Sequence, residues 1–382
     1  MPHPLDRRTF LQAAFGATGA LGAALALPQR ACAGAFGAPG PRNLITDVAG
    51  LRVGQADDPR VRTGVTVILP DGRADAAVDV RGGGPGTRET DALSGWNLVR
   101  SVDAVVLSGG SVYGLGSADG VAAWLGAHGR GFALAPQPGV PPSPIVPTAI
   151  LFDLANGGDK NWGEDPPYRA LARRAVATAA LSFGLGTAGA GFGAAAGALK
   201  GGIGSASYVT HDGMTVGAIV ACNALGSVVA PGGRRFWAGA YEIGREFGGL
   251  GPPDHRATGE DWGLAKLNPE PRANTTIACV ATDVALDPDE LKRVAMMAQD
   301  GLARAIRPVH SPFDGDVVFA LSTARRPAPV AGPATNPLAR PLIVARLGAL
   351  AADTLARAIA RGVYAATVPP GMAIRSWSML PG

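Results

Sequence analysis

The stretch that most constrains the fold is residues 274–283, Asn-Thr-Thr-Ile-Ala-Cys-Val-Ala-Thr-Asp. Its apolar centre favours a strand buried on both faces. The segment before it, residues 231–273, is rich in Gly, Pro and charged residues and is typical of a loop. A threonine where a loop meets a buried strand is ordinarily a strand-edge residue. The alternative is a chain cut between Asn274 and Thr275, which makes the Thr275 hydroxyl a nucleophile and its freed amine the base.

The composition predicts a well-packed protein whose main partner is not nucleic acid. The 382 residues suffice for one large domain or two small ones. Apolar residues make up 47% of the chain and charged residues 17%, which is enough to fill a sizeable core. The formal net charge of +4 is small for this length and argues against nucleic-acid binding.

Residues 1–35 are expected to be an export signal outside the fold. Arg7-Arg8 precedes Thr9-Phe10-Leu11 and an apolar run to Leu27, and Ala31-Cys32-Ala33 is a small-x-small cleavage site. The pattern resembles a twin-arginine signal. The alternative is an uncleaved membrane anchor, but the run is short for a span and interrupted by glycine. We therefore expect a periplasmic or secreted domain of residues 36–382 that does not associate with a membrane once the signal is removed.

The mature chain keeps two cysteines, and export makes a disulfide between them conceivable. Cys279 lies four residues after Thr275, on the same strand face, whereas Cys222 lies next to Asn223 and on the opposite face from it. If Asn223 and Thr275 face one site, the two sulfur atoms point apart. The spacing therefore favours two buried thiols.

Periodicity and turn signals predict the other elements. Strands are expected at Leu51–Val53, Val65–Leu69, Ala76–Val80, Ala104–Leu107, Met214–Asn223 and Val317–Ser322. Helices are expected up to about Leu125, at Tyr168–Ser182 with its arginines outward, at Pro288–Ile306 after the cap Asp287, and at Leu342–Ala360.

Two glycine-containing motifs invite a functional interpretation. The segment 81–90 has three consecutive glycines but no Gly-Lys-Ser/Thr ending, so close packing or a site wall is the better explanation than a phosphate loop. Gly184–Gly189 spells a dinucleotide fingerprint but follows a helix, and it is discounted.

Ser111 follows a strand as in a nucleophile elbow, with Tyr113 where glycine is usual. No histidine is singled out by a neighbouring carboxylate pattern. A Ser-His-Asp hydrolase stays open.

Four polar residues are further site candidates. Asn223 ends an apolar segment, where asparagine is ordinarily a turn residue but is also a suitable oxyanion donor. Lys200 lies in a glycine-rich segment without an acidic sequence neighbour, so a surface lysine and a site lysine are equally open. Asp314 and Asp316 precede a strand and form either a solvated turn or a pair that binds a metal or a cationic group.

Together these residues make the chain resemble the DmpA/BapA family of self-processing aminopeptidases, and within it most nearly the endo-type nylon-oligomer hydrolases. The motifs that carry the resemblance are Gly82–Thr90, Leu107–Ser111, Lys200–Gly204 and Ala281–Asp283. The resemblance implies an α+β fold, a four-layer αββα sandwich like that of N-terminal-nucleophile hydrolases. It also implies a homotetramer of subunits cleaved into 36–274 and 275–382.

The family pattern implies a role for each matching residue. Asn274 is the residue before the cut and Thr275 the nucleophile that the cut frees. Asn223 matches the oxyanion donor, and Asp314 and Asp316 match the pair that orients the nucleophile. The aminopeptidase branch typically has serine as nucleophile and as first member of that pair, so Thr275 and Asp314 follow the nylon-oligomer branch.

Lys200 matches a lysine of the same branch, and its charge could lower the pKa of the Thr275 amine. Phe152 lies near a position where some aminopeptidases carry a site tyrosine, so their substrate contacts do not transfer. The export signal is a second departure, since many members are cytoplasmic.

We therefore expect an amide hydrolase that acts through an acyl-enzyme, without a metal or an organic cofactor. Its expected substrates are peptides cut at the N-terminus or linear amino-acid oligomers. Two alternatives remain: an acyltransferase like the ornithine acetyltransferases, and a non-catalytic binding protein on the same fold.

Overall fold

Strand β12 (Thr275–Val284) lies inside the larger of two stacked sheets, and all its residues are buried, as its apolar sequence predicts. The structure is a computed structural model that describes residues 36–135, 137–254, 258–266, 274–329 and 336–381. The export signal expected at residues 1–35 lies outside these ranges. In the larger sheet β12 pairs antiparallel with β11 and parallel with β13. The sheet runs in the order β10 (Gly202–Val209), β11 (Thr215–Asn223), β12, β13 (Val317–Arg326), β3 (Ala74–Val80) and β5 (Ser101–Val102).

The smaller sheet lies against one face of the larger sheet. Its strands, in spatial order, are β1 (Leu51–Asp58), β2 (Thr63–Pro70), β6 (Val105–Ser108), β7 (Thr148–Ile150) and β4 (Thr87–Arg88). Alternate residues of each strand point to opposite faces. Ile68 and Leu107 of this sheet therefore meet Ile219, Ile277 and Phe319 of the larger sheet in a shared apolar core.

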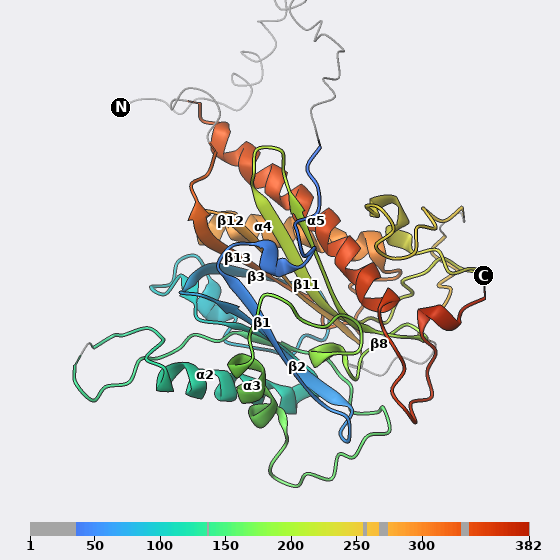
Figure 1. The fold of residues 1–382 in the computed structure, drawn as a ribbon, viewed down its shortest axis with the longest axis horizontal. Helices are drawn as coiled ribbons and strands as arrows, with labels where there is room; N and C mark the ends of the chain where they lie inside the picture. The colour runs from blue at the N-terminus through green and yellow to red at the C-terminus, as the bar shows by residue number, and fades with distance from the viewer. Residues whose placement is uncertain (1–35, 136, 255–257, 267–273, 330–335, 382) are drawn as a thin grey trace, which may run out of the picture. The chain divides into compact units, whose positions relative to one another are not determined.

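Two helices cover the outer face of each sheet (Figure 1). α4 (Pro288–Ala305) and α5 (Ala339–Tyr364) pack on the larger sheet through residues such as Leu291 and Leu355. α2 (Ser117–Ala127) and α3 (Tyr168–Ala177) pack on the smaller sheet through Val121 and Leu171. The layers are therefore helix, sheet, sheet and helix, which confirms the predicted αββα sandwich.

Short elements complete the chain. They are the two-stranded ribbon β8 (Ala195–Ala196) and β9 (Leu199–Lys200), and the 3-10 helices η1 (Ile45–Asp47), η2 (Asp91–Leu93), η3 (Ser111–Gly116), η4 (Gly189–Gly191), η5 (Trp237–Tyr241) and η6 (Trp377–Met379). Residues Gly37–Gly382 form one compact unit.

The predicted elements are present. β1 and α5 extend beyond the predicted Leu51–Val53 and Leu342–Ala360, whereas α3 is shorter than predicted. α3 ends at Ala177, whereas the periodicity predicts a helix to Ser182. The chain leaves the helix because Ala180 forms two backbone hydrogen bonds with Val53 at the edge of β1. Asp287 caps α4 as predicted, since its side chain accepts the N–H of Glu290.

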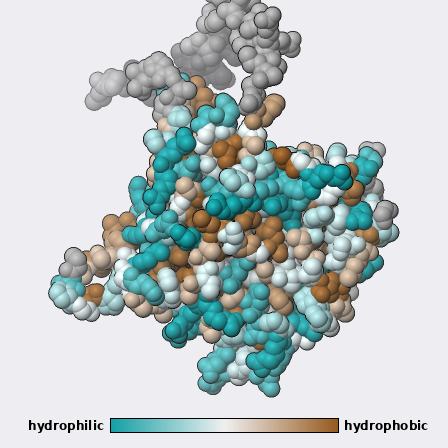
Figure 2. Space-filling model, viewed as in Figure 1, coloured by the Kyte–Doolittle hydropathy of each residue, from teal (hydrophilic) through white to brown (hydrophobic). Residues whose placement is uncertain are grey.

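The surface carries no single dominant apolar region on the face shown in Figure 2, where hydrophobic residues lie in small groups among hydrophilic ones. Within the described ranges, no helix combines the length and the hydropathy needed to cross a bilayer.

Candidate active site

The register of β11 and β12 places Asn223 directly opposite Thr275. Both residues are 2% exposed. Thr275 shares its strand face with Ile277 and Cys279, which pack between the two sheets, whereas Cys222 belongs to the core under the helices. The two cysteines therefore lie on opposite faces of the sheet, and both are free thiols, as predicted.

Residues 314–316 contact the peptide bond between Asn274 and Thr275. Gly315 N–H donates a hydrogen bond to the carbonyl oxygen of Asn274 at 2.9 Å. The Thr275 hydroxyl donates to the same oxygen. The Asn274 side chain is fully buried, and neither its Oδ1 nor its Nδ2 has a hydrogen-bond partner in the described structure. An unpaired buried amide destabilises the fold by about 1–3 kcal/mol.

Asp314 and Asp316 belong to a turn, residues 310–316, that we call the acidic turn. Asp316 is 1% exposed, and its Oδ1 accepts the Thr276 N–H at 2.8 Å. Asp314 is equally buried, and its Oδ1 accepts the Leu225 N–H at 3.2 Å. Burial and the negative charge of Asp316 raise the pKa of Asp314. The pair therefore joins the ends of β11 and β12.

The glycines of residues 82–84 pack against the acidic turn. Gly84 N–H donates to the Asp314 carbonyl at 2.8 Å, and Gly83 N–H donates to the Ser311 carbonyl at 3.2 Å. A Cβ on Gly82 would lie 2.3 Å from the Asp314 carbonyl oxygen, so no other residue fits without a shift of the backbone. This close packing supports the interpretation of the segment as a site wall.

Lys200 is completely buried. Of the two alternatives that the sequence left open, the surface lysine is therefore wrong. Its amine donates to the carbonyl oxygens of Gly191, Ala194 and Gly201 at 2.7–2.9 Å. Burial lowers its pKa to about 7. Lys200 pairs with Ala195 in the β8–β9 ribbon.

The Asn223 side chain is fixed on both of its polar atoms. Its Oδ1 accepts the Ala195 N–H at 2.9 Å, and its Nδ2 donates to the Phe152 carbonyl at 3.1 Å. The ribbon therefore connects Asn223 to Lys200, while Phe152 contributes its backbone to the site. Such a fixed amide is the arrangement that an oxyanion donor requires.

Two site residues escaped the sequence analysis. The sequence analysis singled out no histidine, but His310 Nδ1 lies 2.8 Å from Asp316 Oδ2. Lys266 donates to the Asn223 carbonyl at 3.3 Å, and burial lowers its pKa to about 8. The sequence signals were the proximity of His310 to two aspartates and the scarcity of lysines.

Ser111 is the first residue of η3 and has a left-handed backbone, with φ of 51°. The hydrogen bonds of the described residues give its hydroxyl no histidine partner, so the structure does not assemble a Ser-His-Asp triad there. Among those residues there is also no cluster of three or more His, Cys, Asp or Glu side chains arranged to hold a metal ion.

Comparisons with known proteins give matches over most of the chain. Residues 43–375 match peptidase family S58. The "uncharacterized aminopeptidase Rv1333" of Mycobacterium tuberculosis is 45% identical over 344 residues, which cover 86% of this chain and 96% of that protein. The 6-aminohexanoate-oligomer endohydrolase of Kocuria sp. (strain KY2) is 31% identical over 293 residues, covering 74% of this chain and 76% of the relative.

Solved structures match the fold over most of the chain. A Burkholderia sp. beta-aminopeptidase superimposes with a TM-score of 0.60 at 24% identity, covering 89% of this chain and 92% of its own. The L-aminopeptidase D-Ala-esterase/amidase of Ochrobactrum anthropi, described as a variant of the Ntn-hydrolase fold, gives a TM-score of 0.61 at 23% identity, covering 89% and 90%. The fold is therefore of the N-terminal-nucleophile type, and the chain belongs to peptidase family S58, of the DmpA/BapA type, as a hydrolase of amide bonds.

Proposed function

We propose that the protein cuts its own chain between Asn274 and Thr275 and then hydrolyses amides of peptides or linear amino-acid oligomers with Thr275 as an N-terminal nucleophile. One observation carries the proposal. The Thr275 hydroxyl contacts the carbonyl oxygen of the preceding residue, and Gly315 N–H holds that oxygen at 2.9 Å. Nucleophile, electrophile and a hydrogen-bond donor for the developing oxyanion are therefore together before any cut.

In the proposed cut, Thr275 Oγ1 forms a bond to the Asn274 carbonyl carbon, and the C–N bond between the two residues breaks. The hydroxyl proton passes to the Thr275 nitrogen, which leaves as an amine, and an ester joins the two residues. Water then hydrolyses the ester, which gives an Asn274 carboxylate and restores the Thr275 hydroxyl. The unpaired, buried Asn274 side chain favours this step because it destabilises the uncut chain.

In the proposed turnover the freed hydroxyl attacks a substrate carbonyl, and the Thr275 amine takes the proton and passes it to the departing amine. Asn223, opposite Thr275 in the sheet, supplies the donor for the substrate oxyanion. Water attacks the resulting ester and releases the acid. Asp314 and Asp316 position the nucleophile, and Lys200, buried and linked to Asn223 through Ala195, tunes the electrostatics.

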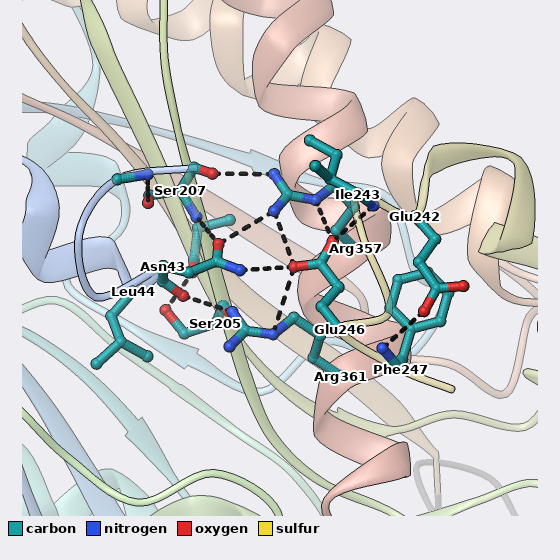
Figure 3. A network of polar contacts seen from close by, with 12 residues as sticks. Asn43, Leu44, Ser205, Ser207, Glu242, Ile243, Glu246, Phe247, Arg357 and Arg361 are labelled. Carbon is teal, nitrogen blue, oxygen red and sulfur yellow. Dashed lines mark hydrogen bonds and ion pairs between the residues drawn. The ribbon is translucent and has the colours of Figure 1, made fainter. Parts of the chain in front are cut away.

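The contacts between residues 36–274 and 275–382 support a cleaved protein that stays together. β11 pairs with β12, and β3 pairs with β13, across the proposed cut. A buried ion pair adds to these ladders, because Glu246 Oε1 lies 2.6 Å from Arg357 Nε on α5 (Figure 3). Separation of the two parts would break a sheet and expose its core.

For the substrate we propose internal amides of amino-acid oligomers. One group of relatives at about 30% identity carries the name 6-aminohexanoate-oligomer endohydrolase. Asp314 and Phe152 also depart from the aminopeptidase pattern. We further propose export through the Arg7-Arg8 signal and assembly as a homotetramer.

The test is the chain composition of the purified protein, measured by intact mass and N-terminal sequencing. Wild type is expected to give two fragments, the smaller beginning at Thr275, whereas Thr275→Ala stays one chain and lacks activity. Thr276→Val is the matched control, since residue 276 packs on the other sheet face, and it is expected to be cut. Two fragments from Thr275→Ala would exclude Thr275 as the agent. Transfer of an acetyl group to ornithine, faster than hydrolysis, would instead indicate an acyltransferase.

A further inference from the structure

His310 opens the acidic turn and makes two hydrogen bonds to one oxygen of Asp316. Its backbone N–H lies 3.1 Å from Asp316 Oδ2, and its ring Nδ1 lies 2.8 Å from the same atom. The Asp316 side chain is 1% exposed, and the His310 side chain is 23% exposed. A carboxylate accepts hydrogen bonds only, so the ring nitrogen at this distance is the donor.

The second oxygen of Asp316 connects this contact to the nucleophile. Asp316 Oδ1 accepts the backbone N–H of Thr276 at 2.8 Å, and Thr276 is bonded directly to Thr275. A continuous set of hydrogen bonds therefore runs from the His310 ring through Asp316 to the residue that follows the nucleophile. A buried carboxylate is costly unless its lone pairs are satisfied, so the ring donor both stabilises and orients Asp316.

We infer that His310 is a positioning residue for this site: its Nδ1–H holds Asp316, and Asp316 holds the backbone at the start of β12, at Thr276 next to Thr275. The inference rests on the proposed role of Thr275. The ring does not touch the reacting atoms, so its effect is on the alignment of the Thr275 hydroxyl and, after the cut, of the Thr275 amine. Small displacements of a nucleophile lower the rate of reaction far more than the binding of substrate.

The backbone at His310 dictates the choice of variants. Its φ of 55° lies in the left-handed region, which asparagine and glycine adopt more readily than other residues. Asparagine also carries its amide nitrogen on Cγ, as histidine carries Nδ1, so His310→Asn keeps both the donor and the conformation. His310→Gly removes the side-chain donor and adds no backbone strain. His310→Gln places its amide nitrogen one bond farther from the main chain. His128, exposed and stacked on Trp124, provides the matched control His128→Asn.

The experiment measures two rates for each variant: the half-time of self-cleavage after cell-free synthesis, and kcat and KM on a linear 6-aminohexanoate oligomer followed by mass spectrometry. His310→Gly and His310→Gln are expected to lower kcat about 100-fold with KM little changed, and to slow self-cleavage. His310→Asn is expected to restore most of both rates, and His128→Asn to match wild type.

Wild-type rates in His310→Gly, or equal loss in His310→Asn and His310→Gly with unchanged melting temperatures, would overturn the inference. If His310→Gly does not fold, the comparison of His310→Asn with His310→Gln decides in the same way. Failure of the proposed function would look different. A wild-type protein that is never cut, or an active Thr275→Ala variant, would exclude Thr275 as the nucleophile.

Discussion

Removal of the Glu246 carboxylate is expected to weaken the fold strongly, because it leaves a buried arginine without its counter-ion. The Arg357 side chain is 2% exposed, and its Nε and Nη2 donate to the two Glu246 oxygens at 2.6 and 2.9 Å. Asn43 also donates to Glu246, at 2.6 Å, so three parts of the chain meet at this carboxylate (Figure 3). Glu246→Ala therefore breaks a network that joins residues on both sides of the proposed cut.

The magnitude follows from the burial of the pair. Loss of one partner of a buried ion pair destabilises a protein by about 3–5 kcal/mol. Unfolding entropy is about 2.1 cal/mol/K per residue near 60 °C, which gives about 0.7 kcal/mol/K over the compact unit Gly37–Gly382. The melting temperature of Glu246→Ala is therefore expected to fall by about 4–7 °C.

Differential scanning calorimetry of four proteins tests this reasoning: wild type, Glu246→Ala, Arg357→Met, and the double variant Glu246→Ala/Arg357→Met. The double variant is expected to be more stable than Glu246→Ala, since it no longer leaves Arg357 buried without its counter-ion. A fall of less than about 1 °C in Glu246→Ala would refute the argument. Strict additivity of the single changes in the double variant would refute it as well.

The same pair predicts a dependence on pH. Burial would raise the pKa of Glu246, but the hydrogen bonds and charge of Arg357 outweigh burial and hold it below the ordinary value of 4.5. A carboxyl group with a lowered pKa contributes stability that is present above 4.5 and is lost as the pH falls through the folded-state pKa. The difference in melting temperature between wild type and Glu246→Ala is therefore expected to shrink below pH 4.5.

Three further predictions concern the site and its surroundings. Asp314→Ala and Asp316→Ala are each expected to lower kcat about 100- to 10,000-fold, and a chelator to change nothing; loss of activity with chelator, restored by a divalent ion, would indicate a metal site. Burial raises the pKa of Asp153 to about 6, so the folded protein binds this proton more tightly than the unfolded chain. As the pH rises from 3.8 to 6, Asp153→Asn is therefore expected to become more stable relative to wild type, by up to about 3 kcal/mol in chemical denaturation. An equal difference in stability at all pH values would contradict this. An N-acetylated 6-aminohexanoate oligomer is expected to be cut at internal amides. If only oligomers with a free amine are cut, and only single N-terminal residues are released, the protein is an aminopeptidase.

Elements with strong periodicity could be predicted from the sequence. The run of apolar residues at 277–281 requires burial on both faces, and β12 has it. Asp287 before a helical pattern, with Glu290 three residues on, predicts the cap that the structure has. These features depend on neighbours in sequence, and local physical chemistry determines them. The end of α3 is different, because a hydrogen-bonded contact with a distant strand competes there with helical propensity.

The surroundings of the site depend on contacts that no periodicity encodes. Lys200 is buried because three carbonyl oxygens of residues 191–201 converge on its amine, and their positions follow from the packing of this glycine-rich segment. His310 and Asp316 are six residues apart in an irregular turn, where neither helical nor strand spacing predicts which side chains meet. Sequence reasoning therefore named candidate site residues but missed the partners that fix them.

Gly315, between the two aspartates, shows how tightly Thr275, the proposed nucleophile, constrains the acidic turn. A Cβ on Gly315 would lie 2.8 Å from Thr275 Oγ1 and 2.8 Å from the Gly84 carbonyl oxygen, so the acidic turn, Thr275 and the segment 82–84 meet at a point that has no room for a side chain. The same residue donates its N–H to the Asn274 carbonyl. The Asp-Gly-Asp sequence thus combines two requirements, since the aspartates must point to the ends of β11 and β12 while the backbone between them must touch the bond before Thr275. A residue with a side chain at 315 would separate these groups even if both carboxylates were kept.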